Sequence, residues 1–195
     1  MNILQNKTFW IAISLVLLMA GTRFDHFGSA FTLPDASYAV FFLAGLYLGR
    51  VRGALTILSL LLVGAASVDY YAINFHGISA WCVTSAYSFL VIAYAALWFV
   101  GRWFAPRHDL SVKGLAGLFS AATVAGSAAF VIANVSFYLL AGYFDRMGAA
   151  EYVASVSQYF GSYVAVTVFY VAAAAGVQMF ALLLAGKPRN GHDTV

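Results

Sequence analysis

Six apolar runs separated by short polar segments make up most of this sequence and limit what it can fold into. Of its 195 residues 63% are hydrophobic and 9% are charged, whereas a soluble domain has about half and about a quarter. So few charges cannot cover a soluble surface, and a helix of roughly 20 apolar residues crosses a bilayer. The expected helices span residues 8–22, 35–50, 53–69, 83–101, 114–142 and 158–186. The sequence therefore predicts an all-α integral membrane protein with six transmembrane helices, in which residues 1–195 form a single domain.

The basic residues are distributed unevenly between the predicted connections. One set of connections contains Arg23 and Arg146. The N-terminus, the alternate connections and the C-terminal segment contain Lys7, Arg50, Arg52, Arg102, Arg107, Lys113, Lys187 and Arg189. Because cytoplasmic loops carry an excess of Lys and Arg, both termini are expected in the cytoplasm. The basic residues behind the net charge of +3 then set the orientation of the helices in the membrane. A nucleic-acid partner is not expected.

The predicted outer connections contain most of the side chains suited to chemistry. These connections are residues 22–35, 69–82 and 143–157. They hold Asp69, two histidines and Cys82, the only cysteine of the chain. A carboxylate at the end of an apolar run usually has a partner, so Asp69 is either a helix-end anchor or a ligand contact. The many aromatic residues nearby are typical of a membrane interface, and also of a pocket for a large, partly apolar ligand.

Several other interpretations of these residues remain open. Cys82 can be a small apolar filler, but an unpaired thiol facing an oxidising compartment is a liability unless it is buried or used. His26 and His76 could ligate a haem, although both lie in predicted loops. Ser79 and Ser85 lie near His76 in the sequence, but no residue that would orient a base is visible for proteolysis. The first run has a poor cleavage site for a signal peptide, so it is expected to remain as a helix.

Two stretches of the outer connections resemble one known family. They are Val68-Asp69-Tyr70-Tyr71 continuing through Gly77-Ile78-Ser79-Ala80-Trp81-Cys82-Val83-Thr84, and Thr22-Arg23-Phe24-Asp25-His26-Phe27-Gly28 followed by Leu33-Pro34-Asp35. With six short helices and cytoplasmic termini, the chain is similar to the BtuM family of bacterial cobalamin transporters. That family is related to the substrate-binding S-components of energy-coupling-factor vitamin transporters. The resemblance implies an S-component-like bundle in the bacterial inner membrane, with a corrinoid site on the periplasmic side.

The resemblance also implies roles for particular residues. Cys82 would ligate the cobalt of the corrinoid and could displace cyanide from cyanocobalamin. The residues implied around the corrinoid are Asp69, Tyr70, Trp81 and Tyr87, with His26 and Arg146 contacting its side-chain amides. Turnover would require an external reductant, and the sequence has no reductase motif, so enzymatic activity is left open. No nucleotide cofactor is expected, because Walker and dinucleotide signatures are missing.

The first apolar run bears on whether the transporter acts alone. Members of the wider group that share an energy-coupling module tend to carry Ala-x-x-x-Ala there, which lets helices approach closely. Here Ala12 is followed by Val16, and Ala20 by Phe24. The sequence therefore favours a solitary corrinoid transporter in the lipid bilayer. The alternatives are a substrate-binding subunit for another vitamin and a membrane thiol or haem redox protein.

Overall fold

The structure is a computed structural model that describes residues 7–23 and 33–185. The elements in chain order are α1 Lys7–Thr22, α2 Ser37–Leu48, α3 Ala54–Phe75, η2 Ala80–Cys82, η3 Ser85–Phe89, α4 Leu90–Phe104, η4 Ala105–Arg107, α5 Val112–Leu140 and α6 Ala149–Ala185. Within those two ranges the regular elements are all helical, as the sequence predicts.

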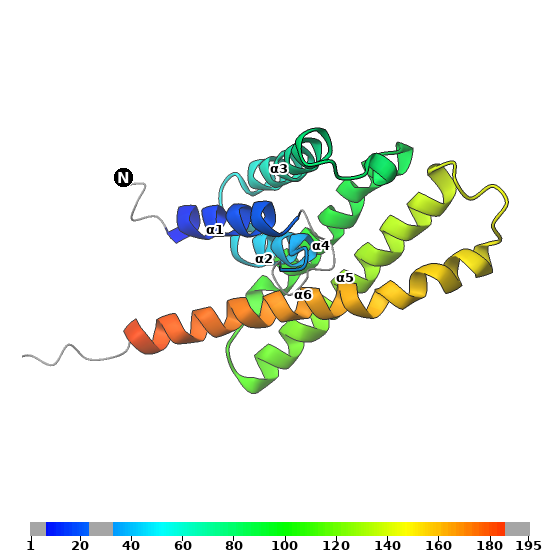
Figure 1. The fold of residues 1–195 in the computed structure, drawn as a ribbon. Coiled ribbons are helices and arrows are strands. Elements are labelled where there is room, and N and C mark those ends of the chain that lie inside the picture. Colours follow the sequence, from blue (N-terminus) through cyan, green and yellow to red (C-terminus); the bar gives the residue numbers. More distant parts are fainter. Residues whose placement is uncertain (1–6, 24–32, 186–195) are drawn as a thin grey trace, which may run out of the picture.

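The short helix α2 lies at the centre of the bundle, between the other helices (Figure 1). It is apolar on all sides, and all its residues are buried except Tyr38 and Tyr47. A helix with no polar face lies either in a protein core or in a membrane, and here other helices surround it. In Figure 1 the start of α1 and the end of α6 point to the same side, while the connections α3–α4 and α5–α6 lie at the opposite end of the molecule.

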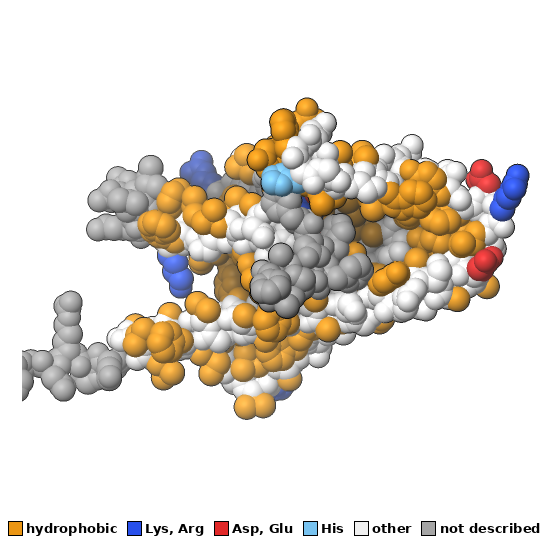
Figure 2. Space-filling view, viewed as in Figure 1, with side chains coloured by type: hydrophobic (Ala, Val, Ile, Leu, Met, Phe, Trp, Pro, Cys, Tyr) orange, Lys and Arg blue, Asp and Glu red, His pale blue; other side chains and the backbone are white. Residues whose placement is uncertain are grey.

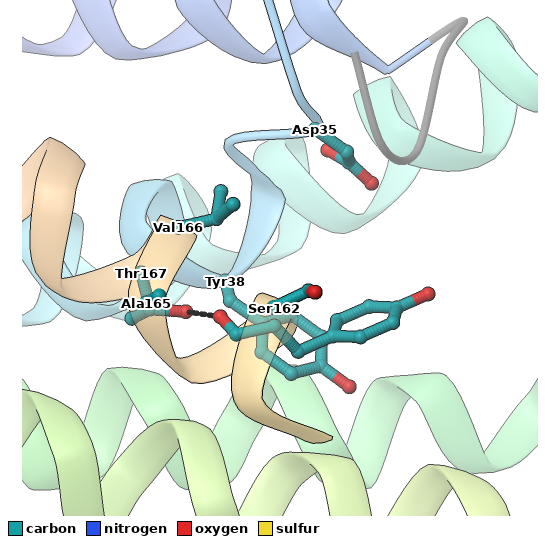
Figure 3. Close-up of a pocket in the computed structure, with 7 residues that line it drawn as sticks. Asp35, Tyr38, Ser162, Ala165, Val166 and Thr167 are labelled. Carbon is teal, nitrogen blue, oxygen red and sulfur yellow. Dashed lines mark hydrogen bonds between the residues drawn. The ribbon is translucent and has the colours of Figure 1, made fainter. Parts of the chain in front are cut away.

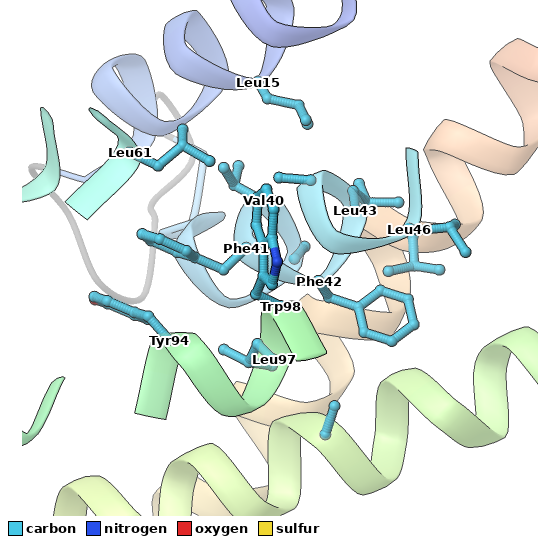
Figure 4. Packing of buried hydrophobic residues seen from close by; sticks show 14 of the residues in the cluster. Leu15, Val40, Phe41, Phe42, Leu43, Leu46, Leu61, Tyr94, Leu97 and Trp98 are labelled. Carbon is cyan, nitrogen blue, oxygen red and sulfur yellow. The ribbon is translucent and has the colours of Figure 1, made fainter. Parts of the chain in front are cut away.

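The core forms where α2 meets α4. Trp98 of α4 is fully buried among Phe41, Phe42 and Leu97 (Figure 4). The two helices approach so closely that a Cβ atom on Gly45 would collide with the carbonyl oxygen of Trp98. Glycine at this position therefore permits a backbone contact that any larger residue would separate.

The outer surface of the bundle is predominantly apolar, as Figure 2 shows for one face. Within residues 7–23 and 33–185, four helical segments are long and apolar enough to cross a membrane. These segments are Ala54–Phe75, Ser85–Arg107, Val112–Leu140 and Ala149–Ala185, and Lys7–Thr22 and Ser37–Leu48 are shorter apolar helices. Exposed leucine, valine and phenylalanine side chains along the long segments are those of a surface that faces lipid.

Two helices extend beyond the apolar runs that define them in the sequence. The third helix is expected over 53–69 but continues to Phe75, where Gly77 with φ 67° follows it. The sixth is expected to begin at residue 158 but begins at Ala149, with Glu151 in its first turn. Hydropathy marks the apolar part of a helix, whereas the helix itself ends at a conformational signal such as glycine with positive φ. Asp69 therefore lies inside α3 and not in a connection.

Candidate functional site

Arg23, directly after α1, is the centre of a polar cluster at the end of the bundle that contains the α3–α4 connection. We call it the Arg23 cluster, and it consists of Arg23, Asp35, Ser37, Asp69, Tyr87 and Tyr94. Arg23 is only 6% exposed. A charged side chain is found at such burial almost only when it is paired, and each of its three guanidinium nitrogens has a partner here.

The two edges of the guanidinium contact different helices. Arg23 Nε and Nη2 donate to Asp69 Oδ1 and Oδ2 of α3 over 2.6 and 2.8 Å. Arg23 Nη1 donates to Ser37 Oγ over 2.6 Å and to Tyr94 OH over 2.8 Å. The ring of Tyr94 is stacked on Phe41, with centroids 4.3 Å apart. The arginine thus joins α3 to the buried pair α2 and α4, with the planar bidentate geometry that lysine cannot reproduce.

A second carboxylate lies on the far side of the guanidinium. Asp35 Oδ2 is 3.9 Å from Arg23 Nη1. Its Oδ1 accepts the backbone N–H of Ser37 over 2.8 Å and the Ser37 hydroxyl over 2.5 Å. Asp35 therefore satisfies a backbone donor at the start of α2, as an acidic residue before a helix does.

A cavity of about 350 Å³ opens beside Asp35. Its lining residues are Asp35, Tyr38, Ser162, Tyr163, Ala165, Val166 and Thr167. In Figure 3 Asp35 stands apart, whereas Tyr38 lies close to Ser162, Ala165 and Thr167 of α6 in this view. The volume is at the lower end of the range for small-molecule sites. The cavity combines tyrosine rings with a carboxylate, so it suits a group that is partly apolar and donates hydrogen bonds.

Asp69 also connects the cluster to the segment that carries Cys82. The hydroxyl of Tyr87, in η3, donates to Asp69 Oδ2 over 2.5 Å. Between α3 and η3 the chain is shaped by two short polar turns. Ser79 Oγ accepts from Trp81 N, and Thr84 Oγ1 accepts from Ala86 N, each over 3.2 Å. Cys82 therefore lies between Trp81 and Ala86, whose backbone N–H groups are held by these two turns.

Cys82 is exposed and forms no disulfide. Burial by its neighbours removes part of the hydration of the thiol and raises its pKa, and the Asp69 carboxylate raises the pKa further. Both effects disfavour the thiolate. A soft metal centre would have to displace the thiol proton on binding, because the thiolate is the form that ligates metals.

Aromatic rings lie around the Cys82 segment. The indole of Trp81 stacks on the ring of Tyr143, which belongs to the α5–α6 connection. Both side chains are about half exposed. The pair lies on the segment that carries Cys82 and on the α5–α6 connection.

The other residues expected at the site are not members of the Arg23 cluster in the part of the chain that the structure describes. Tyr70 is 66% exposed on α3, and Arg146 is an exposed residue of the α5–α6 connection. His76 caps the end of α3. His26 lies outside the described residues. The structure thus brings Asp69, Tyr87, Cys82 and Trp81 to one end of the bundle.

From the sequence alone, no role is assigned to the residue that organises the cluster. In the sequence Arg23 is one of two basic residues in the predicted outer connections and part of a stretch that carries the family resemblance. The sequence did contain a sign of this role. An arginine next to an apolar helix requires a partner, and Asp69 is a carboxylate that likewise lies at the end of an apolar run. Ser37 and Tyr94 carry no such signal, since serine and tyrosine are ordinary residues in apolar helices.

A different polar cluster lies at the other end of α2. We call it the Gln178 cluster, and it consists of Tyr47, His108 and Gln178. Tyr47 OH donates to Gln178 Oε1 over 2.9 Å, and His108 Nε2 is 3.0 Å from the same oxygen. Because an amide oxygen only accepts, His108 carries its proton on Nε2 in this arrangement. The Gln178 cluster joins α2, the α4–α5 connection and α6.

Across residues 7–23 and 33–185 no three His, Cys, Asp or Glu side chains gather closely enough to hold a metal ion. A metal at Cys82 would therefore have to arrive with most of its ligands already in place. No known family model matches the chain, and no curated protein matches it.

Proposed function

We propose that this protein takes up a corrinoid across the bacterial inner membrane, and that it binds the corrinoid at the periplasmic end of the bundle with cobalt ligated by Cys82. In this proposal all six apolar helices cross the membrane, α1 and α2 included, and both termini are cytoplasmic. The protein acts alone in the bilayer. The single observation that carries the proposal is the exposed thiol of Cys82, next in sequence to the stacked Trp81, at the end of a bundle of apolar helices.

The surroundings of Cys82 fit a ligand that brings its own metal cage. A lone thiol can supply one axial ligand, and a corrin ring supplies the four equatorial nitrogens. The stacked rings of Trp81 and Tyr143 offer a flat surface of the kind that a macrocycle can cover. A corrin ring with its side chains is larger than the cavity beside Asp35. The macrocycle would therefore rest at the end of the bundle, and one amide-bearing side chain would enter the cavity.

The reaction with cyanocobalamin is a ligand exchange. The Cys82 thiol loses its proton, the sulfur–cobalt bond forms, and the cobalt–carbon bond to cyanide breaks. Cyanide leaves with both electrons of that bond and takes up a proton as hydrogen cyanide, so the oxidation state of cobalt does not change. Each protein molecule would remove one cyanide unless a reductant later released the thiolate.

The experiment that tests this proposal is an absorbance titration of purified protein with cyanocobalamin. We expect the corrin bands to shift and one equivalent of cyanide to be released. Cys82→Ser keeps the size of the side chain but replaces sulfur by a far poorer ligand for cobalt, so it should show neither change. Binding itself can survive in this variant, because contacts with the macrocycle remain.

Three outcomes would contradict the proposal. A spectral shift in Cys82→Ser equal to that of the natural protein would mean that sulfur does not ligate cobalt. A Soret band in the purified protein would indicate a haem redox protein. If the protein binds no corrinoid, the alternative function is that of a substrate-binding subunit for another vitamin. The matched control is Ser88→Ala, because Ser88 is an exposed residue of the same segment that bonds only within its own turn.

A further inference from the structure

The outer half of α3, residues 65–75, has little apolar packing to hold it in place. The buried residues of α3 are Ala54, Leu58, Leu61, Ala65 and Ala72, which lie mainly in its first half. Tyr70, Tyr71 and Phe75 in the second half are exposed. Side-chain packing and interhelical hydrogen bonds fix one helix against another within a bilayer, so with few buried residues this half depends more on its polar contacts.

Three hydrogen bonds to the outer half of α3 converge on Asp69. Its two carboxylate oxygens accept from Nε and Nη2 of Arg23, and Oδ2 also accepts from Tyr87 OH. The side chain of Asp69 is 20% exposed and that of Arg23 is 3% exposed. Hydrogen bonds between charged groups at such burial are stronger than those at a surface.

Arg23 in turn is hydrogen-bonded to buried residues of the core. Its Nη1 donates to Ser37 and Tyr94, which lie in the buried pair of helices α2 and α4. Tyr94 is 5% exposed and Ser37 is 1% exposed. One edge of the guanidinium therefore contacts buried residues of α2 and α4, and the other edge contacts the half of α3 that has few buried residues.

We propose that Arg23 is a positioning residue for Cys82, which it holds in place through Asp69 and Tyr87. The carboxylate of Asp69 is then occupied by Arg23 and Tyr87, and it shapes the site without contacting the ligand itself. Breaking the Arg23–Asp69 pair frees the outer half of α3 and the segment 76–84 that follows it. The effect of Arg23 on uptake rests on the proposed corrinoid function, because both concern the same site. The contacts that hold Cys82 in place involve no ligand.

The test uses the fact that Cys82 is the only cysteine of the chain. A nitroxide spin label attached to Cys82 in the full-length protein reports the motion of that segment by electron paramagnetic resonance, without corrinoid. We expect Arg23→Gln and Asp69→Asn each to raise the ratio of mobile to immobile label about tenfold, the size expected for one lost charge-assisted hydrogen bond. The double variant should differ little from either single variant, because each removes the same interaction.

Two further variants keep the test decisive if Arg23→Gln does not fold. Arg23→Lys retains the charge but loses the bidentate geometry, so it should mobilise the label partially. Tyr87→Phe breaks the second contact of Asp69 and should mobilise the label with Arg23 intact. The matched control is Gln178→Leu, which removes the polar cluster at the other end of α2. It should lower the melting temperature and leave the label immobile.

Three results would overturn the inference. The label could stay immobile in both single variants, the effects of the two could multiply in the double variant, or Gln178→Leu could mobilise the label equally. The last result would mean that any loss of stability loosens this segment. Failure of the corrinoid titration leaves this experiment unaffected, since the spin label is read in ligand-free protein.

Discussion

The indole of Trp81 lies almost parallel to the ring of Tyr143, with centroids 3.9 Å apart and an interplanar angle of 11°. The Tyr143 hydroxyl also donates to the Trp81 carbonyl oxygen over 3.4 Å. This pair joins the segment that carries Cys82 to the α5–α6 connection, whereas the Asp69–Tyr87 bond joins it to α3. Cys82 therefore lies on a short segment that is held from both sides.

Replacing Tyr143 by alanine should make Cys82 more accessible. The change removes a stacking interaction of about 0.5 to 1.5 kcal/mol, so a thiol reagent should react about two to ten times faster. The measurement is the rate of maleimide labelling at fixed pH. Phe180→Ala removes an exposed aromatic residue at the far end of α6 and should leave the rate unchanged. Equal acceleration in the two variants would mean that the Trp81–Tyr143 pair does not shield the thiol.

The reactivity of Cys82 should depend on pH in a way that Asp69 controls. Burial and the Asp69 carboxylate raise the pKa of the thiol, so the reactive thiolate forms only at a higher pH than for a free cysteine. Asp69→Asn removes the negative charge and should move the labelling profile to lower pH. Asp145→Asn, an exposed carboxylate in the α5–α6 connection, serves as the control and should not move it. A profile unchanged in Asp69→Asn would show that burial alone sets the pKa.

The closest contact in the core should tolerate no added methyl group. Gly45→Ala places a Cβ against the backbone of Trp98, and we expect a loss of about 1 to 3 kcal/mol in the free energy of unfolding. Gly176→Ala, within α6, meets no atom within 4 Å and should be neutral or slightly stabilising. Thermal unfolding in detergent measures both. Similar melting temperatures for the two variants would contradict the close packing of α2 on α4.

The predicted topology can be tested in intact cells. A reporter that is active only in the cytoplasm should be active when it is fused after Val195. A membrane-impermeant maleimide should label Cys82 from the periplasmic side. Labelling that requires permeabilised membranes would reverse the orientation. In that event the proposed corrinoid site would face the cytoplasm and could not serve uptake.

How well the sequence predicted the structure depended on the kind of signal. The helical class followed from uninterrupted apolar runs, and the helical residues confirm it. The end of α3 was placed too early, because Asp69 and Tyr70 interrupt the apolar run but not the helix. In a helix of this kind polarity marks where a partner is needed, whereas Gly77 marks where the helix stops.

The site was only partly visible in the sequence for a different reason. Cys82 was identified because it is unique in the chain, and Asp69 because a carboxylate is rare in an apolar run. The pairing of Asp69 with Arg23 joins residues 46 positions apart. The contacts of that arginine with Ser37 and Tyr94 depend on how α2 packs against α4, and no local pattern records such packing.

The length of α2 has a consequence for the electric field in this protein. The helix has 12 residues, which correspond to about 18 Å, whereas the hydrocarbon core of a bilayer is about 30 Å thick. Polar clusters lie at both of its ends, one around Arg23 and one around Gln178. If α2 crosses the membrane as proposed and water reaches both clusters, the membrane voltage falls over the shorter distance. The field along α2 is then about 1.7 times that in the surrounding lipid, and the Arg23–Asp69 pair lies at one edge of that narrow insulating layer.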